Sequence, residues 1–287
     1  MLTLQNEKIS IKVKPFGAEL CSIFHKENQL EYMWQAGSEW PKHSPILFPI
    51  VGQLKDNFFV HEDKHFALPR HGFAREKNFS LIEQGPNRLV FRLSNDDDTI
   101  KYYPFHFNLE VEYALQENNV IVTYIVENTH HENMFFSIGA HPAFKVPLYE
   151  NENYNDYKIL FDVDVVADNW PLELGLIKES PKQFLINKNE LLLTKEMFMD
   201  DALVFKKFGA SSLTLQSKNH SRGLRFELNQ APYLGLWAAK NADFICIEPW
   251  HGIADSVNSN GQLNKKEGII KLLPKDEFKY SYSINVF

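Results

Sequence analysis

The sequence lacks the features that mark disulfide-rich, zinc-binding and membrane-spanning proteins. Two cysteines among 287 residues cannot build a disulfide framework, and no clustered Cys/His spacing indicates a structural zinc site. No apolar run approaches the roughly 20 residues that span a bilayer. The first residues also lack the basic stretch followed by an apolar one that a secretory signal requires. We therefore expect no membrane partner and a cytoplasmic location.

An excess of basic charge is also absent. The net charge is −7, which argues against nucleic acid as a partner, because binding phosphates requires a basic surface. Such a charge suits a protein that binds a neutral small molecule. Aromatic residues, in contrast, are abundant at 14%, which favours strands and aromatic-lined pockets.

Helical periodicity is weak, and many short apolar segments separated by turn residues predict strands instead. Their spacing of roughly 8–12 residues is typical of a sandwich or barrel. No linker or repeat divides the chain, so we expect one all-β domain over residues 1–287. One short helix is expected at residues 188–197. The main expected strands span residues 9–13, 17–24, 30–34, 58–60, 66–68, 79–82, 88–93, 107–115, 119–128, 157–166, 202–208, 212–216, 224–228, 234–237, 244–247 and 278–284.

A carboxylate ends one buried strand near the C-terminus. Residues 244–247 are apolar, and Glu248 and Pro249 follow them, so we expect the strand to stop there. A charged group at the end of an apolar run is costly to bury without a partner or a task. Trp237 and Trp250 lie close in sequence and could stack on a sugar ring, although core packing explains them about equally well.

A histidine stands in a similar setting more than a hundred residues earlier. The apolar residues 135–138 are followed by two small residues and then by His141 and Pro142. A lone histidine of this kind is more often a satisfied core residue. The parallel with Glu248 and Pro249, two titratable groups each followed by proline at a strand end, favours a shared acid–base site.

Two further segments carry polar groups in short connections. His71 lies in a basic loop beside Arg70 and Arg75, which alone would indicate only a solvated turn. Asp200 and Asp201 precede an apolar strand, where aspartate commonly caps a turn.

Together these segments resemble the aldose 1-epimerase (galactose mutarotase-like) family, and within it the LacX-like branch. The resemblance runs over essentially the whole chain, and the shared order and spacing of several short motifs carry it. These motifs are Gly17-Ala18-Glu19-Leu20, Pro45-Ile46-Leu47-Phe48-Pro49, His71-Gly72-Phe73-Ala74-Arg75, His141-Pro142-Ala143-Phe144 and Ile247-Glu248-Pro249-Trp250.

The resemblance implies a fold, a reaction and site residues. It implies a large twisted antiparallel β-sandwich, the galactose mutarotase-like supersandwich, with a sugar cleft across one sheet. The implied reaction interconverts the α and β anomers of a free aldose without metal or cofactor. Glu248 matches the general base, His141 the general acid and His71 a sugar-binding histidine. Asp201 is our choice for the sugar-binding acid, with Asp200 a near-equal candidate.

The sequence departs from the family at Gln53, where an arginine often follows the glycine that aligns with Gly52. Arg70, Lys55 or Arg75 could replace that contact. Three alternatives stay open: a sugar-binding or regulatory protein without turnover, a hexose-6-phosphate mutarotase using the two arginines, and a glycosidase or polysaccharide lyase on a related β-sandwich. The glycosidase ranks well below the others, because it needs a second catalytic carboxylate, such as Asp201 or Asp255.

Overall fold

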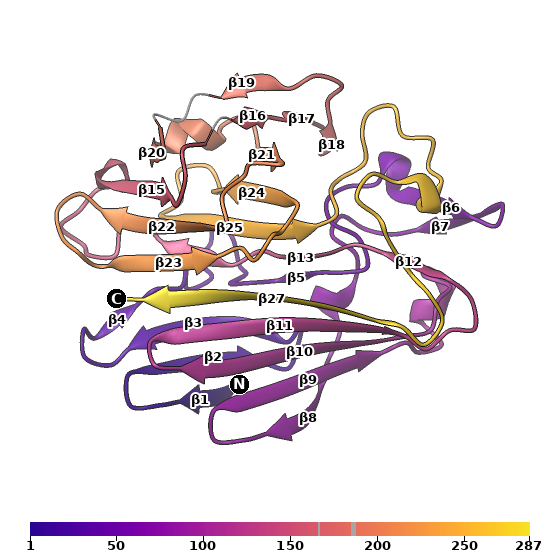
Figure 1. Cartoon of the computed structure of the whole chain (residues 1–287), viewed down its shortest axis with the longest axis horizontal. Coiled ribbons are helices and arrows are strands. Elements are labelled where there is room, and N and C mark those ends of the chain that lie inside the picture. Colours follow the sequence, from indigo (N-terminus) through magenta and orange to yellow (C-terminus); the bar gives the residue numbers. More distant parts are fainter. Residues whose placement is uncertain (166, 185–187) are drawn as a thin grey trace.

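Two large antiparallel sheets dominate the protein (Figure 1). The computed structural model describes residues 1–165, 167–184 and 188–287. The nine-stranded sheet has the order β20 (Glu190–Leu192), β15 (Tyr157–Phe161), β22 (Ser212–Ser217), β23 (Gly223–Glu227), β27 (Glu277–Val286), β11 (Asn119–Asn128), β10 (Phe107–Gln116), β9 (Arg88–Ser94) and β8 (Ser80–Gln84). The eight-stranded sheet has the order β19 (Lys182–Phe184), β16 (Ala167–Asn169), β21 (Leu203–Lys206), β24 (Tyr233–Trp237), β25 (Phe244–His251), β13 (Ile138–Ala140) and β5 (Ile46–Leu47), and β14 (Ala143–Lys145) also pairs with β25.

Smaller sheets and single helical turns complete the fold. A four-stranded sheet contains β1 (Leu2–Gln5), β2 (Ile9–Lys14), β3 (Glu19–His25) and β4 (Leu30–Glu31). Three strand pairs are β6 (Phe58–His61) with β7 (Lys64–Ala67), β12 (Met134–Phe136) with β26 (Ile270–Leu272), and β17 (Leu172–Glu173) with β18 (Leu176–Ile177). The 3₁₀ turns are η1 (Lys55–Asn57), η2 (Ala74–Glu76), η3 (Thr99–Lys101), η4 (Tyr154–Asp156), η5 (Lys195–Phe198) and η6 (Leu263–Lys265).

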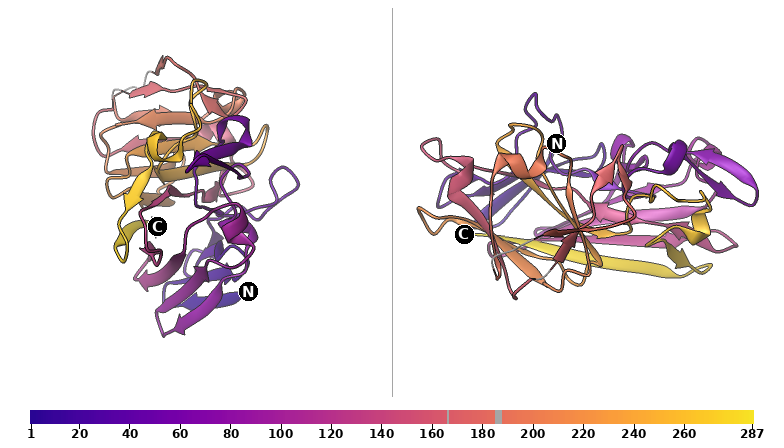
Figure 2. Two further views of the ribbon diagram at one scale, coloured as in Figure 1. Left: turned by 90° about the vertical axis from the view of Figure 1, so that its right-hand side faces the viewer. Right: turned by 90° about the horizontal axis from the view of Figure 1, so that it is seen from above.

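The core lies between the sheets and draws on all parts of the chain. Alternate residues of β10 are buried, as expected for a strand with one face towards the core. Phe144 of β14 approaches Phe226 of β23 with ring centroids 6.1 Å apart, and Phe48 lies 5.0 Å from Phe107 of β10. The left-hand view in Figure 2 shows the strands stacked, with the indigo N-terminal strands at one end and the orange strands at the other.

Most of the strand pattern was predictable from the sequence. Every expected strand range contains a strand, and the expected hairpin of residues 58–60 and 66–68 is formed by β6 and β7. One expected range, 157–166, ends at Val166, which lies outside the described residues. The expected helix at residues 188–197 is wrong. That segment contains the short strand β20, in which Leu191 is buried between less buried neighbours, and it ends in η5.

The expectation that a strand stops at residue 247 is also wrong. Strand β25 continues through Glu248 and Pro249 to His251. Proline is tolerated there because β25 lacks a continuous partner on one side. Strand β14 pairs with it up to Cys246, and β13 pairs with it from Trp250 onwards. On the other side β24 pairs with it throughout this stretch.

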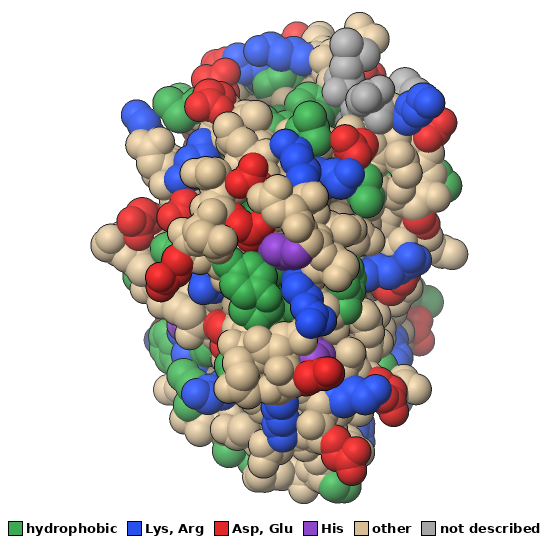
Figure 3. Space-filling view, turned by 90° about the vertical axis from the view of Figure 1, so that its left-hand side faces the viewer, with side chains coloured by type: hydrophobic (Ala, Val, Ile, Leu, Met, Phe, Trp, Pro, Cys, Tyr) green, Lys and Arg blue, Asp and Glu red, His purple; other side chains and the backbone are tan. Residues whose placement is uncertain are grey.

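The exterior agrees with the charge balance of the sequence. On the face shown in Figure 3, Lys and Arg side chains are interspersed with Asp and Glu side chains. Within the described residues, no helix is long and apolar enough to cross a membrane.

A buried ion pair fixes the segment that follows β25. The ammonium group of Lys266 donates to Asp255 Oδ1 at 2.8 Å and to the carbonyl of Ile253 at 2.6 Å. Asp255 Oδ2 also accepts from the backbone N–H of Lys55 at 3.0 Å. Both side chains are almost fully buried, so removing one partner leaves an uncompensated charge.

We therefore predict that Lys266→Met lowers the free energy of unfolding by about 3–5 kcal/mol. Urea denaturation followed by tryptophan fluorescence measures the change. The adjacent Lys265 is exposed, so Lys265→Met is a matched control and is expected to change stability little. An unchanged midpoint in Lys266→Met would contradict this account of the ion pair.

Candidate active site

The break in the ladder beside β25 brings His141 and Glu248 together. Gly139 pairs with Trp250 and Ala143 pairs with Cys246, so the same register places His141 opposite Glu248. Directly opposite residues on antiparallel strands have Cβ atoms about 4.5–5.5 Å apart. The ladder opens at Pro142, whose carbonyl still accepts from the N–H of Ile247 at 3.2 Å. His141 and Glu248 thus form a cross-strand pair of titratable side chains, and each is followed directly by a proline.

The pair lies at the wall of a cavity of about 220 Å³. His141 Nε2 lies 3.4 Å from Glu248 Oε2, and both side chains are almost completely buried. The nitrogen His141 Nδ1 and the oxygen Glu248 Oε2 have no hydrogen-bond partner in the protein. Buried polar atoms are normally satisfied, so these two atoms are candidates for contacts with a bound molecule.

Burial shifts the two pKa values in opposite directions. Loss of solvation raises the pKa of the Glu248 carboxyl well above 4.5, against the opposing effect of the Arg70 charge. Loss of solvation, together with the positive charges of Arg75 and Arg70, lowers the pKa of His141 to about 3. Burial disfavours both charged forms, so the ligand-free site favours a neutral carboxyl beside a neutral imidazole.

A second histidine lines the same cavity with a defined tautomer. The backbone N–H of Gly52 donates to His71 Nδ1 at 3.1 Å, so the neutral ring carries its proton on Nε2. Burial and the neighbouring His141, Arg70 and Arg75 lower the pKa of His71 well below 6.5. His71 also has a positive φ of 68°, a strained conformation that is common at functional sites. The ring is therefore suited to donate one hydrogen bond into the cavity.

Indole rings form much of the remaining wall. Trp40 stacks on the imidazole of His141 with centroids 5.0 Å apart, and Trp237 meets that imidazole edge-on at 5.6 Å. Trp250 lies between neighbouring strands, where a Cβ on Gly139 or Gly235 would come within 2.6 Å of its ring. The two glycines therefore allow this indole to lie against the sheet.

Acidic and basic side chains complete the cavity. Asp201 and Arg70 both line it, with Arg70 Nη2 3.7 Å from Asp201 Oδ1. Asp201 has a positive φ of 95° and accepts from the N–H of Ala202 at 2.8 Å. Arg75 also lines the cavity, and its Nη2 donates to the carbonyl of Arg70 at 2.8 Å.

Comparisons with known proteins agree with this geometry. A sequence model of the family named Aldose 1-epimerase matches residues 1–283. The chain belongs to the aldose 1-epimerase family. The chromosomal protein LacX of Lactococcus lactis subsp. lactis is 35% identical over 297 aligned positions, covering 99% of both chains.

Solved structures confirm the fold of this family member. A galactose mutarotase related enzyme from Lactobacillus acidophilus has a TM-score of 0.93 at 31% identity, covering 100% of this chain and 97% of that one. A galactose mutarotase-like protein from Lactobacillus casei has a TM-score of 0.94 at 25% identity, covering 100% of both chains. The expected galactose mutarotase-like fold, a large twisted antiparallel β-sandwich, is thereby confirmed.

The epimerase-family fold brings most of the sequence-predicted site residues to one cavity. Eight of them line it: Arg70, His71, Arg75, His141, Asp201, Trp237, Glu248 and Trp250. Asp200 does not line it, so Asp201 is the better candidate of the two. Gln53 lies beside the cavity with its side-chain amide directed to Asn57 and to the carbonyl of Leu54. Lys55 instead directs its ammonium to the carbonyl of Ser259.

Sequence reasoning missed Trp40. This residue lies in the connection between β4 and β5, and its ring reaches His141 only through the fold. The one sequence signal was a tryptophan followed by Pro41, shortly before the proline-punctuated segment at residues 44–54.

Proposed function

We propose that the protein is an aldose 1-epimerase that interconverts the α and β anomers of a free aldose. The observation that carries the proposal is the pair of His141 and Glu248, held opposite each other at 3.4 Å on the wall of a cavity. Family membership supports a sugar as substrate. A cavity of about 220 Å³ with three indole rings suits a single sugar ring.

Ring opening needs one proton removed and one proton delivered. In the proposed mechanism the Glu248 carboxylate takes the proton of the anomeric hydroxyl, and the His141 imidazolium protonates the ring oxygen as the bond from C1 to O5 breaks. The open-chain aldehyde rotates about C1–C2, so the ring oxygen attacks the other face. Reclosure returns both protons, and the pair is regenerated without a metal or cofactor.

The pKa shifts show which protonation state of the His141–Glu248 pair burial favours during this cycle. Burial favours a protonated Glu248 carboxyl and a neutral His141 imidazole. The two side chains have the same protonation states after ring opening, when the open-chain aldehyde is bound. The charged pair that starts ring opening contains the same number of protons, so it is reached by moving one proton between the two side chains. The bound sugar, with hydroxyls that can contact Glu248 Oε2 and His141 Nδ1, would stabilise that charged pair.

The other cavity residues have supporting roles in this proposal. His71 Nε2–H donates to a sugar oxygen, and the carboxylate of Asp201 accepts from sugar hydroxyls. Trp237 and Trp250 offer flat apolar surface to the ring, and Arg70 holds Asp201 in place. Gln53, one residue beyond Gly52, would have to turn away from Asn57 to contact a sugar.

The alternative functions are distinguished by specific groups. Glycoside hydrolysis needs two carboxylates across the scissile bond, and Asp255 is engaged by Lys266 instead. A sugar phosphate remains compatible with the cavity, because Arg70 and Arg75 both line it. Sugar binding without turnover needs no acid paired with a base, which is why the pair favours catalysis.

We predict that Glu248→Gln and His141→Asn each lower the enzymatic rate of anomer interconversion by about 10²–10⁴, because each removes one proton-transfer group. Polarimetry on freshly dissolved α-aldoses, with and without a 6-phosphate, measures the rate above the spontaneous reaction. Asp200→Asn, an exposed carboxylate outside the cavity, is the matched control and should retain full activity. Full activity in either cavity variant would remove that residue from the mechanism, and wild-type binding without any acceleration would favour a sugar-binding protein.

The pKa shifts also predict the pH profile of kcat/KM in the free enzyme. Activity requires the pair to hold one proton, so it falls when a second proton binds at low pH or when the last one leaves at high pH. If both residues had their ordinary pKa values, kcat/KM would fall at low pH as Glu248 became protonated near pH 4.5. The shifted values move this acid limb to the His141 pKa of about 3, and they place the alkaline limb at the raised pKa of Glu248.

We therefore expect kcat/KM to be the same at pH 4.5 and pH 6 after subtraction of the spontaneous rate, because the shifted acid limb lies below both values. A half-maximal value near pH 4.5 would show that burial does not shift the pair as described. Circular dichroism at both pH values tests that the fold is retained.

A further inference from the structure

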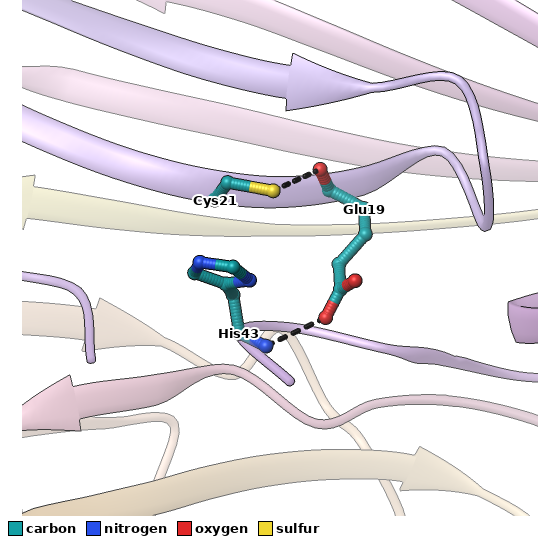
Figure 4. A group of neighbouring side chains, drawn as sticks. All are labelled: Glu19, Cys21 and His43. Carbon is teal, nitrogen blue, oxygen red and sulfur yellow. Dashed lines mark hydrogen bonds between the residues drawn. The ribbon is translucent and has the colours of Figure 1, made fainter. Parts of the chain in front are cut away.

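A second cluster of chemically reactive side chains lies outside the sugar cavity. Glu19 and Cys21 belong to β3, and His43 belongs to the connection that leads from β4 to β5 (Figure 4). Their potential ligand atoms, a carboxylate oxygen, a thiol sulfur and an imidazole nitrogen, all lie within 4.8 Å of one another. None of the three residues lines the cavity that contains His141 and Glu248.

Burial and orientation distinguish this cluster from a chance surface group. Glu19 and Cys21 are 4% and 2% exposed, and Figure 4 shows the Glu19 carboxylate beside the His43 residue, with the Cys21 thiol on the same strand as Glu19. The nitrogen His43 Nδ1 is buried and has no hydrogen-bond partner. A buried ring nitrogen without a hydrogen-bond partner is costly in either tautomer, and in the tautomer that leaves Nδ1 unprotonated a cation would satisfy it.

The surrounding contacts orient the ligand atoms. Glu19 Oε1 accepts from the backbone N–H groups of His43 at 2.6 Å and Ser44 at 2.9 Å, which fixes the carboxylate beside the imidazole. The Cys21 thiol donates to the carbonyl of Glu19 at 3.2 Å. The two N–H bonds to Glu19 do not involve a ligand proton and would hold the carboxylate around a metal, whereas the bond from the thiol would be lost with its proton.

One charged group competes for the same carboxylate. The ammonium of Lys14 pairs with Glu19 Oε2, and the Lys14 side chain is 30% exposed. A divalent cation bound between the three side chains would place more charge beside Glu19 than the ammonium does. Lys14 can then move into solvent, because its side chain already reaches the surface.

We propose that Glu19, Cys21 and His43 form a binding site for a zinc-type divalent cation. Sulfur, imidazole nitrogen and carboxylate oxygen are the donor types that Zn²⁺ prefers, and three protein ligands leave a fourth position for water. Binding replaces the thiol proton, which is released to solvent, by a bond from sulfur to the metal.

The site would join β3 to the segment that carries Trp40. Trp40 precedes His43 by three residues and stacks on His141, while the carbonyl of His43 accepts from the N–H of Ala143 at 2.9 Å. A bound cation would therefore stabilise the wall of the sugar cavity from behind. This role is independent of the proposed epimerase activity, because no ligand of the site belongs to the cavity.

Cobalt provides a spectroscopic probe, because a bond from thiolate to Co²⁺ gives a charge-transfer band in the near ultraviolet. We expect the full-length protein to bind one Co²⁺ with this band, and Zn²⁺ to displace it. Cys21→Ser should abolish the band. Cys246 is the other cysteine of the chain, and its sulfur lies within 4.8 Å of ligand atoms of His141 and Glu248. Cys246→Ser is therefore the matched control, because it tests whether the band arises from that second group.

Three results of these Co²⁺ measurements would contradict the proposed site. Absence of the band in the wild-type protein at saturating Co²⁺, its persistence in Cys21→Ser, or its loss in Cys246→Ser would each overturn the proposal. If Cys21→Ser does not fold by circular dichroism, the partly exposed ligand is changed instead. His43→Gln should then weaken Co²⁺ binding by more than about tenfold, and unchanged affinity would overturn the proposal.

Discussion

The site depends on an interrupted strand ladder. Strands β13 and β14 pair with β25 in the same register, and His141 and Pro142 form the gap between them. A proline on each strand at this gap removes backbone donors that a continuous ladder would need, and Pro249 is accommodated because its open side faces the gap. What remains is a histidine and a glutamate in cross-strand contact, positioned by backbone geometry rather than by flexible loops.

Burial then determines the protonation of the pair. Two charges at this depth lose their hydration, so the protein favours a neutral carboxyl and a neutral imidazole in the free site. The same low-polarity surroundings make any stabilisation of the charged pair by substrate effective, because polar contacts are stronger away from water. Trp40, Trp237 and Trp250 supply these surroundings, and His71 adds a donor whose tautomer is fixed by the N–H of Gly52.

The strands and the principal site residues could be predicted because their signals are local. Alternating burial in residues 107–115 follows from period-two patterning, and β10 and β11 pair where expected. A functional role for Glu248 was predicted because a charged residue follows an apolar segment, a signal that requires no knowledge of the fold. The continuation of β25 through Pro249 could not be predicted, because it depends on which side of the strand lacks a partner.

The contacts that sequence reasoning missed are those between distant segments. Trp40 reaches His141 from another connection, and the choice of Asp201 over Asp200 depends on which of the two side chains lines the cavity. The protonation of Glu248 and His141 could not be predicted for a related reason. Burial is the largest cause of both pKa shifts, and the depth of a side chain cannot be read from the sequence.

The central claim is that Glu248 and His141 act as one proton-transfer unit, and a double-mutant cycle tests it most directly. Rates of anomer interconversion are compared for the wild type, Glu248→Gln, His141→Asn and the double variant, with folding confirmed for each by circular dichroism. If the residues act as a unit, the double variant loses no more activity than the more damaging single change. Losses that multiply would show independent contributions and would contradict the account.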